Sequence, residues 1–162
     1  MSRRISMFKR YPKKDFKYDN FILSLLINKV LKNGKKRLAR RIVYKALELI
    51  ENRIKKKPME ILEKAIKNAG PRIQVLLKSN GKKMLPTPTL LNKYGSSQIA
   101  IRWIVEISRN HSGKSMSLKL SNELIDAYKN IGNVIKKKEA MHKYAESNKS
   151  YTQYNSEDTY EI

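Results

Sequence analysis

NGKKRLARRIVYKALELIENRI, residues Asn33–Ile54, carries the clearest structural pattern in this chain of 162 residues. Its apolar residues recur at intervals of three and four, which is typical of an amphipathic helix. They are Ala39, Ile42, Val43, Ala46, Leu47, Ile50 and Ile54. Arg37, Arg41 and Lys45 fall on the opposite side. The stretch predicts a helix that buries one face and presents cations on the other.

Helical patterns continue on both sides of this stretch. Before it, Asp19 is a suitable N-cap for a mostly apolar helix that ends at Asn33-Gly34. After it, Pro58 suits the first position of a helix that Gly70-Pro71 stops. The apolar character of these segments predicts that both helices belong to the core.

Three more helices are expected in the C-terminal half. Gly95-Ser96-Ser97 offers caps for the first, which carries Trp103 on its inward face. The other two begin at about Ser115 and Asn133. The whole chain therefore has about six helices.

Residues 72–91 show a different period. Apolar residues alternate from Ile73 to Leu77, and Asn80-Gly81 supplies a turn, so a β-hairpin is expected. Pro86 and Pro88 cannot donate to a ladder, which confines their strand to an edge. The fold class indicated is all-α with a β-ribbon arm, in which one hairpin projects from a helical body.

The charge indicates the kind of partner. Lys and Arg number 36 against 14 Asp and Glu, a formal charge of +22, and a polyanion such as nucleic acid would relieve this repulsion. No segment approaches the roughly 20 apolar residues that span a bilayer. A membrane-surface helix would carry Trp or Phe on its apolar face, which residues 33–54 lack. A DNA-binding regulator would need an apolar stripe for dimerisation, and none is left over.

The sequence shows no arrangement of residues that is typical of a catalytic or metal-binding site. The chain has no cysteine and only two histidines, His111 and His142, in no known catalytic arrangement. His111 is expected in a loop as a solvated side chain. We predict no enzymatic activity, no cofactor, no metal and no small-molecule substrate.

Four clusters of cations are candidate RNA contacts. The helix at 33–54 has five cations within two turns and no nearby acid, which favours phosphate contact. A basic hairpin tip suits a nucleic-acid groove. The N-terminal cluster fits an RNA-binding arm or a transit peptide, and the run at 136–138 fits a solvated surface as well as an RNA contact. The clusters comprise Lys35, Lys36, Arg37, Arg40 and Arg41; Lys78, Lys82 and Lys83; Arg3, Arg4, Lys9 and Arg10; and Lys136, Lys137 and Lys138.

The chain is expected to form one domain with two extensions. Residues 1–18 make a basic arm, and residues 19–150 make the helical domain, with the hairpin at about 72–91. Residues 151–162 form a tail that is acidic at its end, where Glu157, Asp158 and Glu161 stand without a cation.

From Arg3 to about Tyr154 the sequence resembles the small-subunit ribosomal protein seven family, in its bacterial and organellar form. The family pattern can be laid from Asn33 to Tyr154 without a gap. The motifs that carry the resemblance are Asn33-Gly34-Lys35-Lys36 with Ile42-Val43-Tyr44, Ala65 to Pro71 with Asn68, Arg102-Trp103-Ile104-Val105-Glu106, Lys114-Ser115-Met116 with Asn122-Glu123-Leu124, Lys136-Lys137-Lys138-Glu139 with His142, and Ala145-Glu146 with Asn148-Lys149.

The resemblance implies six helices with a β-ribbon and a structural role in the small ribosomal subunit. It implies binding to the 3′ major domain of the small-subunit rRNA, nucleation of head assembly, neighbouring head proteins, and proximity to the exit-site tRNA and the mRNA exit path. By position it implies that Lys17 also contacts RNA. The outward-facing Arg102 and the motif residue Lys114 complete the candidate set.

This chain departs from the family pattern at several positions. Ser96 and Ser97 replace a basic pair, Phe16 replaces the proline of an Asp-Pro-Lys element, and Lys82 replaces a turn glycine. Abundant Lys, Asn, Ile and Tyr indicate an A+T-rich genome. We expect a mitochondrial ribosome and a protein made inside the organelle, since the resemblance begins at Arg3 and leaves no room for a transit peptide; a plastid and a bacterial cytoplasm are the alternatives.

Overall fold

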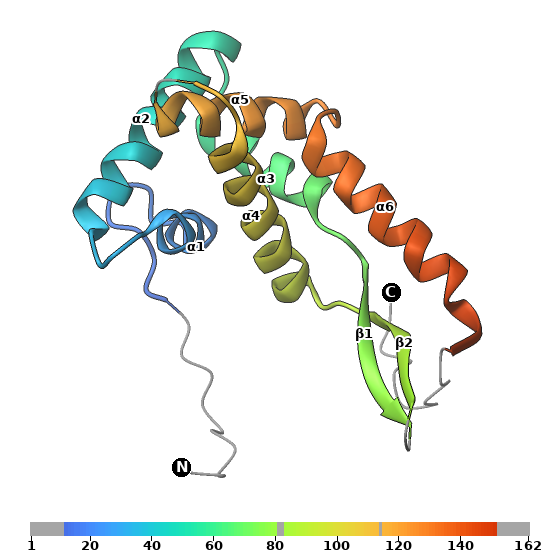
Figure 1. Cartoon of the computed structure of the whole chain (residues 1–162). Helices are drawn as coiled ribbons and strands as arrows, with labels where there is room; N and C mark the ends of the chain where they lie inside the picture. The colour runs from blue at the N-terminus through green and yellow to red at the C-terminus, as the bar shows by residue number, and fades with distance from the viewer. Residues whose placement is uncertain (1–11, 81–82, 114, 152–162) are drawn as a thin grey trace, which may run out of the picture.

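The computed structural model describes residues 12–80, 83–113 and 115–151, and within them the chain forms six α-helices and one two-stranded antiparallel ribbon (Figure 1). Strands β1 (Ile73–Asn80) and β2 (Lys83–Leu90) lie between α3 and α4, and a 3-10 turn, η1 (Lys149–Tyr151), follows the last helix. The predicted fold class is confirmed. The helices are α1 (Phe21–Val30), α2 (Lys36–Ile54), α3 (Pro58–Ala69), α4 (Lys93–Asn110), α5 (Met116–Tyr128) and α6 (Asn133–Ser147).

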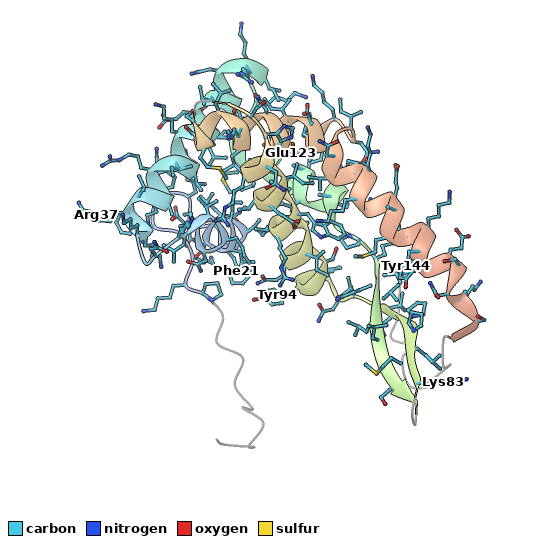
Figure 2. All side chains as sticks on the ribbon, in the orientation of Figure 1. Phe21, Arg37, Lys83, Tyr94, Glu123 and Tyr144 are labelled. Carbon is cyan, nitrogen blue, oxygen red and sulfur yellow. The ribbon has the colours of Figure 1, made fainter. Side chains whose placement is uncertain are left out.

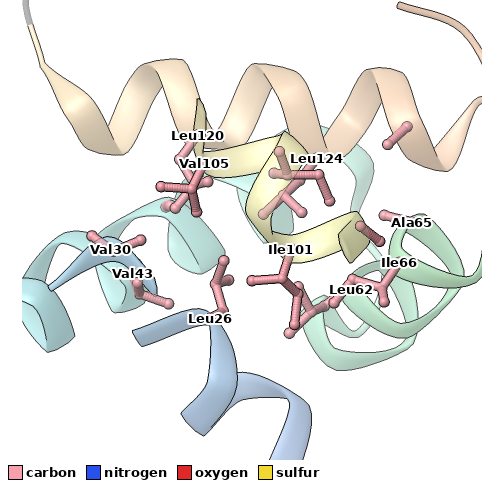
Figure 3. Close-up of a cluster of buried hydrophobic side chains, with 14 of the residues drawn as sticks. Leu26, Val30, Val43, Leu62, Ala65, Ile66, Ile101, Val105, Leu120 and Leu124 are labelled. Atoms are coloured by element: carbon pink, nitrogen blue, oxygen red, sulfur yellow. The ribbon is translucent and has the colours of Figure 1, made fainter. Parts of the chain in front are cut away.

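Helix α5 lies at the centre of the helical body, in contact with α2, α3 and α4. Its Leu120 and Leu124 are fully buried among side chains from the first four helices (Figure 3). The predicted inner face of α2 is confirmed, because Val43, Leu47 and Ile50 are also fully buried. This burial on one side fixes the direction in which the cations of α2 point.

Trp103 belongs to the core, as its place on the apolar stripe of α4 predicts. The side chain is 5% exposed, and the Lys137 ammonium lies over its ring, 5.8 Å from the centroid. The ring is therefore not available as a stacking surface.

Two helix starts differ from the predictions. The N-cap of α1 is Asn20 and not Asp19, because the Asn20 Oδ1 accepts hydrogen bonds from the backbone N–H groups of Ile22 and Leu23 at 2.8 and 3.2 Å. Helix α4 begins before Gly95-Ser96-Ser97, with Asn92 as its N-cap and the Gly95 N–H as donor at 2.7 Å. In both places a neighbouring Asn satisfies the free N–H groups instead.

Side chains from distant helices close several helix ends. The Asn68 amide of α3 donates to the carbonyls of Ala127 and Tyr128 at the end of α5, at 3.0 and 3.1 Å. The Arg109 guanidinium of α4 donates to the Lys29 and Val30 carbonyls at the end of α1, both at 3.3 Å. Because terminal carbonyls have no partner within their own helix, these bonds fix helices to one another.

The ribbon extends from the body beside α6, against which β1 packs (Figure 1). At its base the Arg72 N–H donates to His142 Nε2 at 3.1 Å. Burial, with Lys138 and Arg72 nearby, lowers the pKa of His142 and so favours the neutral ring that can accept this bond. The ribbon is thus attached to the helical body through α6.

The prolines of β2 occupy positions where the ladder needs no donor. Pro86 stands opposite Leu77 and Pro88 opposite Val75. The Leu91 N–H bonds to the Arg72 carbonyl, and since hydrogen-bonded pairs alternate along an antiparallel ladder, both prolines fall in non-hydrogen-bonded pairs. Asn80 is paired with Lys83 and so belongs to β1, not to the turn predicted at Asn80-Gly81; Gly81 lies outside the described residues.

One face of the ribbon is apolar and open. Residues directly opposite one another share a face, so this face combines the odd-numbered residues of β1 with the even-numbered residues of β2. Leu77, Met84 and Leu90 on it are 65%, 61% and 75% exposed, whereas Thr87 on the other face is buried. The apolar face consists of Ile73, Val75, Leu77, Met84, Pro86, Pro88 and Leu90, interrupted by Ser79.

His111 lies beyond the end of α4 and is exposed, as expected, and it also contacts a carboxylate of α5. It follows α4 directly, and its Nε2 lies 3.0 Å from the Glu123 Oε2 of α5. Glu123 is buried, and among the described residues its second oxygen, Oε1, has no hydrogen-bond partner. Burial raises the pKa of Glu123 against the opposing effect of His111.

We predict that Trp103→Ala lowers the free energy of unfolding by roughly 3 to 5 kcal/mol, because it empties a large buried volume. Thermal and urea unfolding would measure the change. A variant with unchanged stability and reduced RNA binding would contradict the core assignment.

We also predict that the stability of the wild-type protein falls relative to Glu123→Gln as the pH rises. Because the pKa of Glu123 is raised, the folded state favours the neutral carboxyl group. This preference stabilises the fold at a pH below 4.5, the ordinary pKa of Glu, and the stabilisation is lost as the pH rises through the pKa of Glu123 in the folded state. Gln retains a neutral side chain at every pH.

Melting temperatures measured from pH 4 to pH 8 would test this. The exposed Glu51→Gln is the matched control and should show no such trend. A Glu123→Gln variant that loses stability relative to wild type as the pH rises would mean that the ionised carboxylate stabilises the fold.

Candidate nucleic-acid interface

The outer side of α2 is a surface of cations, as predicted. Arg37 and Arg41 are exposed, and together with Arg40 and Lys45 they line an open depression of about 470 Å³. Arg37 points away from the body at its edge (Figure 2). Tyr44 and Glu48 complete the lining, so only one carboxylate adjoins four cations. We call the four cations, Arg37, Arg40, Arg41 and Lys45, the basic face.

The start of α2 adds positive charge to this surface. Lys35 and Lys36 are exposed at the helix N-terminus, where the first turn has no acid and no side chain caps the free N–H groups. Asn33 and Gly34 reverse the chain here with φ values of 52° and 72°. Because a helix N-terminus is the positive end of the helix dipole, an anion would stabilise this end.

Residues 13–20 form a turn that is fixed to α1 and α2, and we call it the anchored turn. Asp15 is buried, and the Tyr44 hydroxyl donates to its two carboxylate oxygens at 3.0 and 2.8 Å. Burial and this bond to Asp15 raise the pKa of Tyr44 to about 12, so the hydroxyl keeps its proton. The Ser24 hydroxyl donates to the Lys13 carbonyl at 2.7 Å. Tyr44 thereby joins the anchored turn to the basic face.

The anchored turn presents Lys17, a predicted RNA contact, and Phe16, which was not predicted as one. Lys17 is exposed, and its ammonium lies 5.3 Å from the ring centroids of both Tyr18 and Tyr44. Phe16 beside it is 98% exposed. Sequence reasoning treated Phe16 only as a departure from the family proline, although an aromatic residue among lysines is itself a signal of nucleic-acid contact.

A second cationic area surrounds Arg102. This residue is exposed and lines a depression with Lys29, Arg109 and Glu106. Glu106 is paired with Lys137, whose ammonium lies 3.0 Å from each carboxylate oxygen. The predicted Lys137 is therefore engaged within the protein, whereas Lys136 next to it is exposed.

Lys78 and Lys83 are exposed near the end of the ribbon. Arg37 and Lys83 lie far apart on the molecule, so a single ligand that touches both has to extend along it (Figure 2). The other predicted contacts lie outside the described residues; they are Arg3, Arg4, Lys9, Arg10, Lys82 and Lys114.

Other kinds of site find little support in the described part of the chain. No group of three or more His, Asp and Glu residues there could hold a metal ion. None of the helices built from those residues is long and apolar enough to cross a membrane.

Comparison with known proteins identifies the family. The chain is 40% identical over 154 residues to the small ribosomal subunit protein uS7 of Thermosynechococcus vestitus, a match that covers 95% of this chain and 99% of the relative. It is 41% identical over 143 residues to the uS7c protein of Trieres chinensis, with 88% and 90% covered. For the uS7c protein of Cyanidium caldarium the identity is 44% over 137 residues, with 85% and 88% covered.

These relatives are named as ribosomal proteins, which confirms the predicted resemblance and the prediction that the chain is not an enzyme. They do not establish a mitochondrial origin. The family model described as ribosomal protein S7p/S5e matches residues 2–149, almost the whole sequence. The chain therefore belongs to the ribosomal protein S7p/S5e family.

Proposed function

We propose that this protein, a structural constituent of the small ribosomal subunit, binds the 3′ major domain of the small-subunit rRNA and nucleates assembly of the head. The observation that carries the proposal is the one-sided arrangement of α2, whose buried stripe holds Arg37, Arg40 and Arg41 outward beside the anchored turn. Because the helix is already formed, the side chains of these cations have to be ordered when they contact phosphates, but their backbone does not.

The distribution of acids supports the same function. Buried Asp15 is bound by Tyr44, Glu106 is paired with Lys137, and buried Glu123 contacts His111. These three carboxylates act within the fold, so Glu48 is the one carboxylate that lines the depression with the four cations of the basic face, which keep an excess of positive charge. Such a surface attracts a polyanion in preference to a neutral ligand.

We assign the ribbon a second role, beside the exit-site tRNA and the mRNA exit path. Its end carries exposed Lys78 and Lys83, which suit RNA backbones. Its open apolar face suits a protein surface, because exposed apolar patches of this kind mark interaction sites. Neighbouring head proteins are the partners proposed for that face.

The compartment of the ribosome is part of the proposal. A mitochondrial ribosome is the interpretation that we favour from the Lys-, Asn- and Ile-rich composition, and a plastid or a bacterial cytoplasm is the alternative. The names uS7 and uS7c among the relatives agree with a ribosomal location in each case.

RNA binding can be tested directly with the full chain. We expect it to bind a 3′-major-domain rRNA fragment more tightly than an unrelated RNA of equal length. The logarithm of the affinity should fall linearly with the logarithm of the salt concentration, by about 0.7 to 0.9 for each phosphate contacted. Filter binding or fluorescence anisotropy at several salt concentrations gives both results. Equal affinity for the two RNAs would contradict the assigned target, and a slope near zero would contradict phosphate contact.

Replacing Arg37 and Arg41 together by Ala should weaken binding and reduce the size of the salt slope by about 1.5, because two phosphate contacts are lost. The fold should persist, since both side chains are exposed. The matched control is Lys57→Ala with Lys67→Ala, which removes the same charge from exposed positions at the two ends of α3. An equal loss of binding in the control would show that net charge, and not the basic face, determines affinity.

A further inference from the structure

Phe16 is an apolar side chain that the fold holds in solvent. At 98% exposure it is the most exposed of the large hydrophobic residues in the described chain. Leaving a Phe side chain in water forgoes the stabilisation that burial would give. Its exposure does not come from a loose segment, because Asp15 before it is bonded to Tyr44 of α2 and Lys17 after it is bonded to Asp15.

The backbone around Phe16 is fixed from several directions. The Asp15 N–H donates to the Asn20 carbonyl at 3.3 Å, and the Lys17 N–H donates to the Asp15 carboxylate at 3.2 Å. Asp15 is in turn held by the Tyr44 hydroxyl. Phe16 therefore stands at the tip of a turn whose base is buried, and the backbone that carries its ring into solvent is held in position before any ligand arrives.

The surroundings of the ring are cationic. Lys13, Lys14 and Lys17 flank it and are exposed, and only Lys14 is neutralised in part, by Asp19 at 3.0 Å. Tyr44 continues this surface into the basic face. A protein pocket for Phe16 would have to bury these ammonium groups as well, whereas RNA offers phosphates to the lysines and a flat base to the ring.

We propose that Phe16 stacks on an unpaired nucleobase of the RNA whose phosphates lie against the basic face and the anchored turn. The inference rests on the proposed RNA-binding function and adds a ligand to it: a base in a single-stranded loop or bulge, where it is free to stack.

The test compares three variants of the full chain on the 3′-major-domain fragment. Phe16→Ala should weaken binding by about 5- to 150-fold, the range expected from loss of one stacked base. Phe16→Leu keeps an apolar side chain without an aromatic face and should bind nearly as weakly. Phe16→Trp should restore the affinity, with quenching of the additional Trp fluorescence on RNA binding relative to the wild-type protein, whose Trp103 is buried.

Two measurements distinguish the loss of stacking from the loss of a phosphate contact and from unfolding. The salt slope should stay unchanged in all three variants, because no phosphate contact is removed. Their melting temperatures should equal that of the wild type, since the ring packs on almost nothing.

The outcomes separate this inference from the proposed function. If the wild-type protein fails to bind the fragment, the proposed function fails. If the wild type binds and Phe16→Ala or Phe16→Leu binds equally well, stacking is wrong. A Phe16→Ala protein that binds RNA normally but does not enter small subunits would assign Phe16 to a protein pocket and would also overturn the inference.

Discussion

Burial of one side of α2 against α5 is the interaction on which the rest of the molecule depends. The buried Val43, Leu47 and Ile50 determine the rotation of the helix about its axis. That rotation alone directs Arg37 and Arg41 to solvent. The apolar contact between α2 and α5 thus determines where the positive charge of α2 is displayed.

The few carboxylates have a disproportionate part in building this surface. Asp15 holds the anchored turn through Tyr44, and Glu106 engages Lys137 on the outer side of Trp103. In each case an acid fixes a structural element or a cation within the protein. The strong excess of positive charge therefore coexists with a defined fold. The acids attract their partners where structural elements meet, and the cations that repel one another lie on the solvent-exposed surface.

The sequence allowed much of this to be predicted. Periodicity is enough to place the buried stripe of α2 and the core position of Trp103, since both follow from local spacing. It could not choose between Asp19 and Asn20 as a cap, because both residue types cap helices and only the backbone angles decide. The bonds from Asp15 to Tyr44 and from Lys137 to Glu106 join residues 29 and 31 positions apart, so no local pattern contains them.

The two prolines of β2 affect how the unbound protein can associate with copies of itself. An open apolar ribbon would ordinarily be a template for edge-to-edge growth of sheets between molecules. Here β1 packs against α6, and the outward edge of β2 lacks two N–H groups at Pro86 and Pro88. The missing donors therefore disfavour the addition of a further strand at this edge while the apolar face of the ribbon is still exposed.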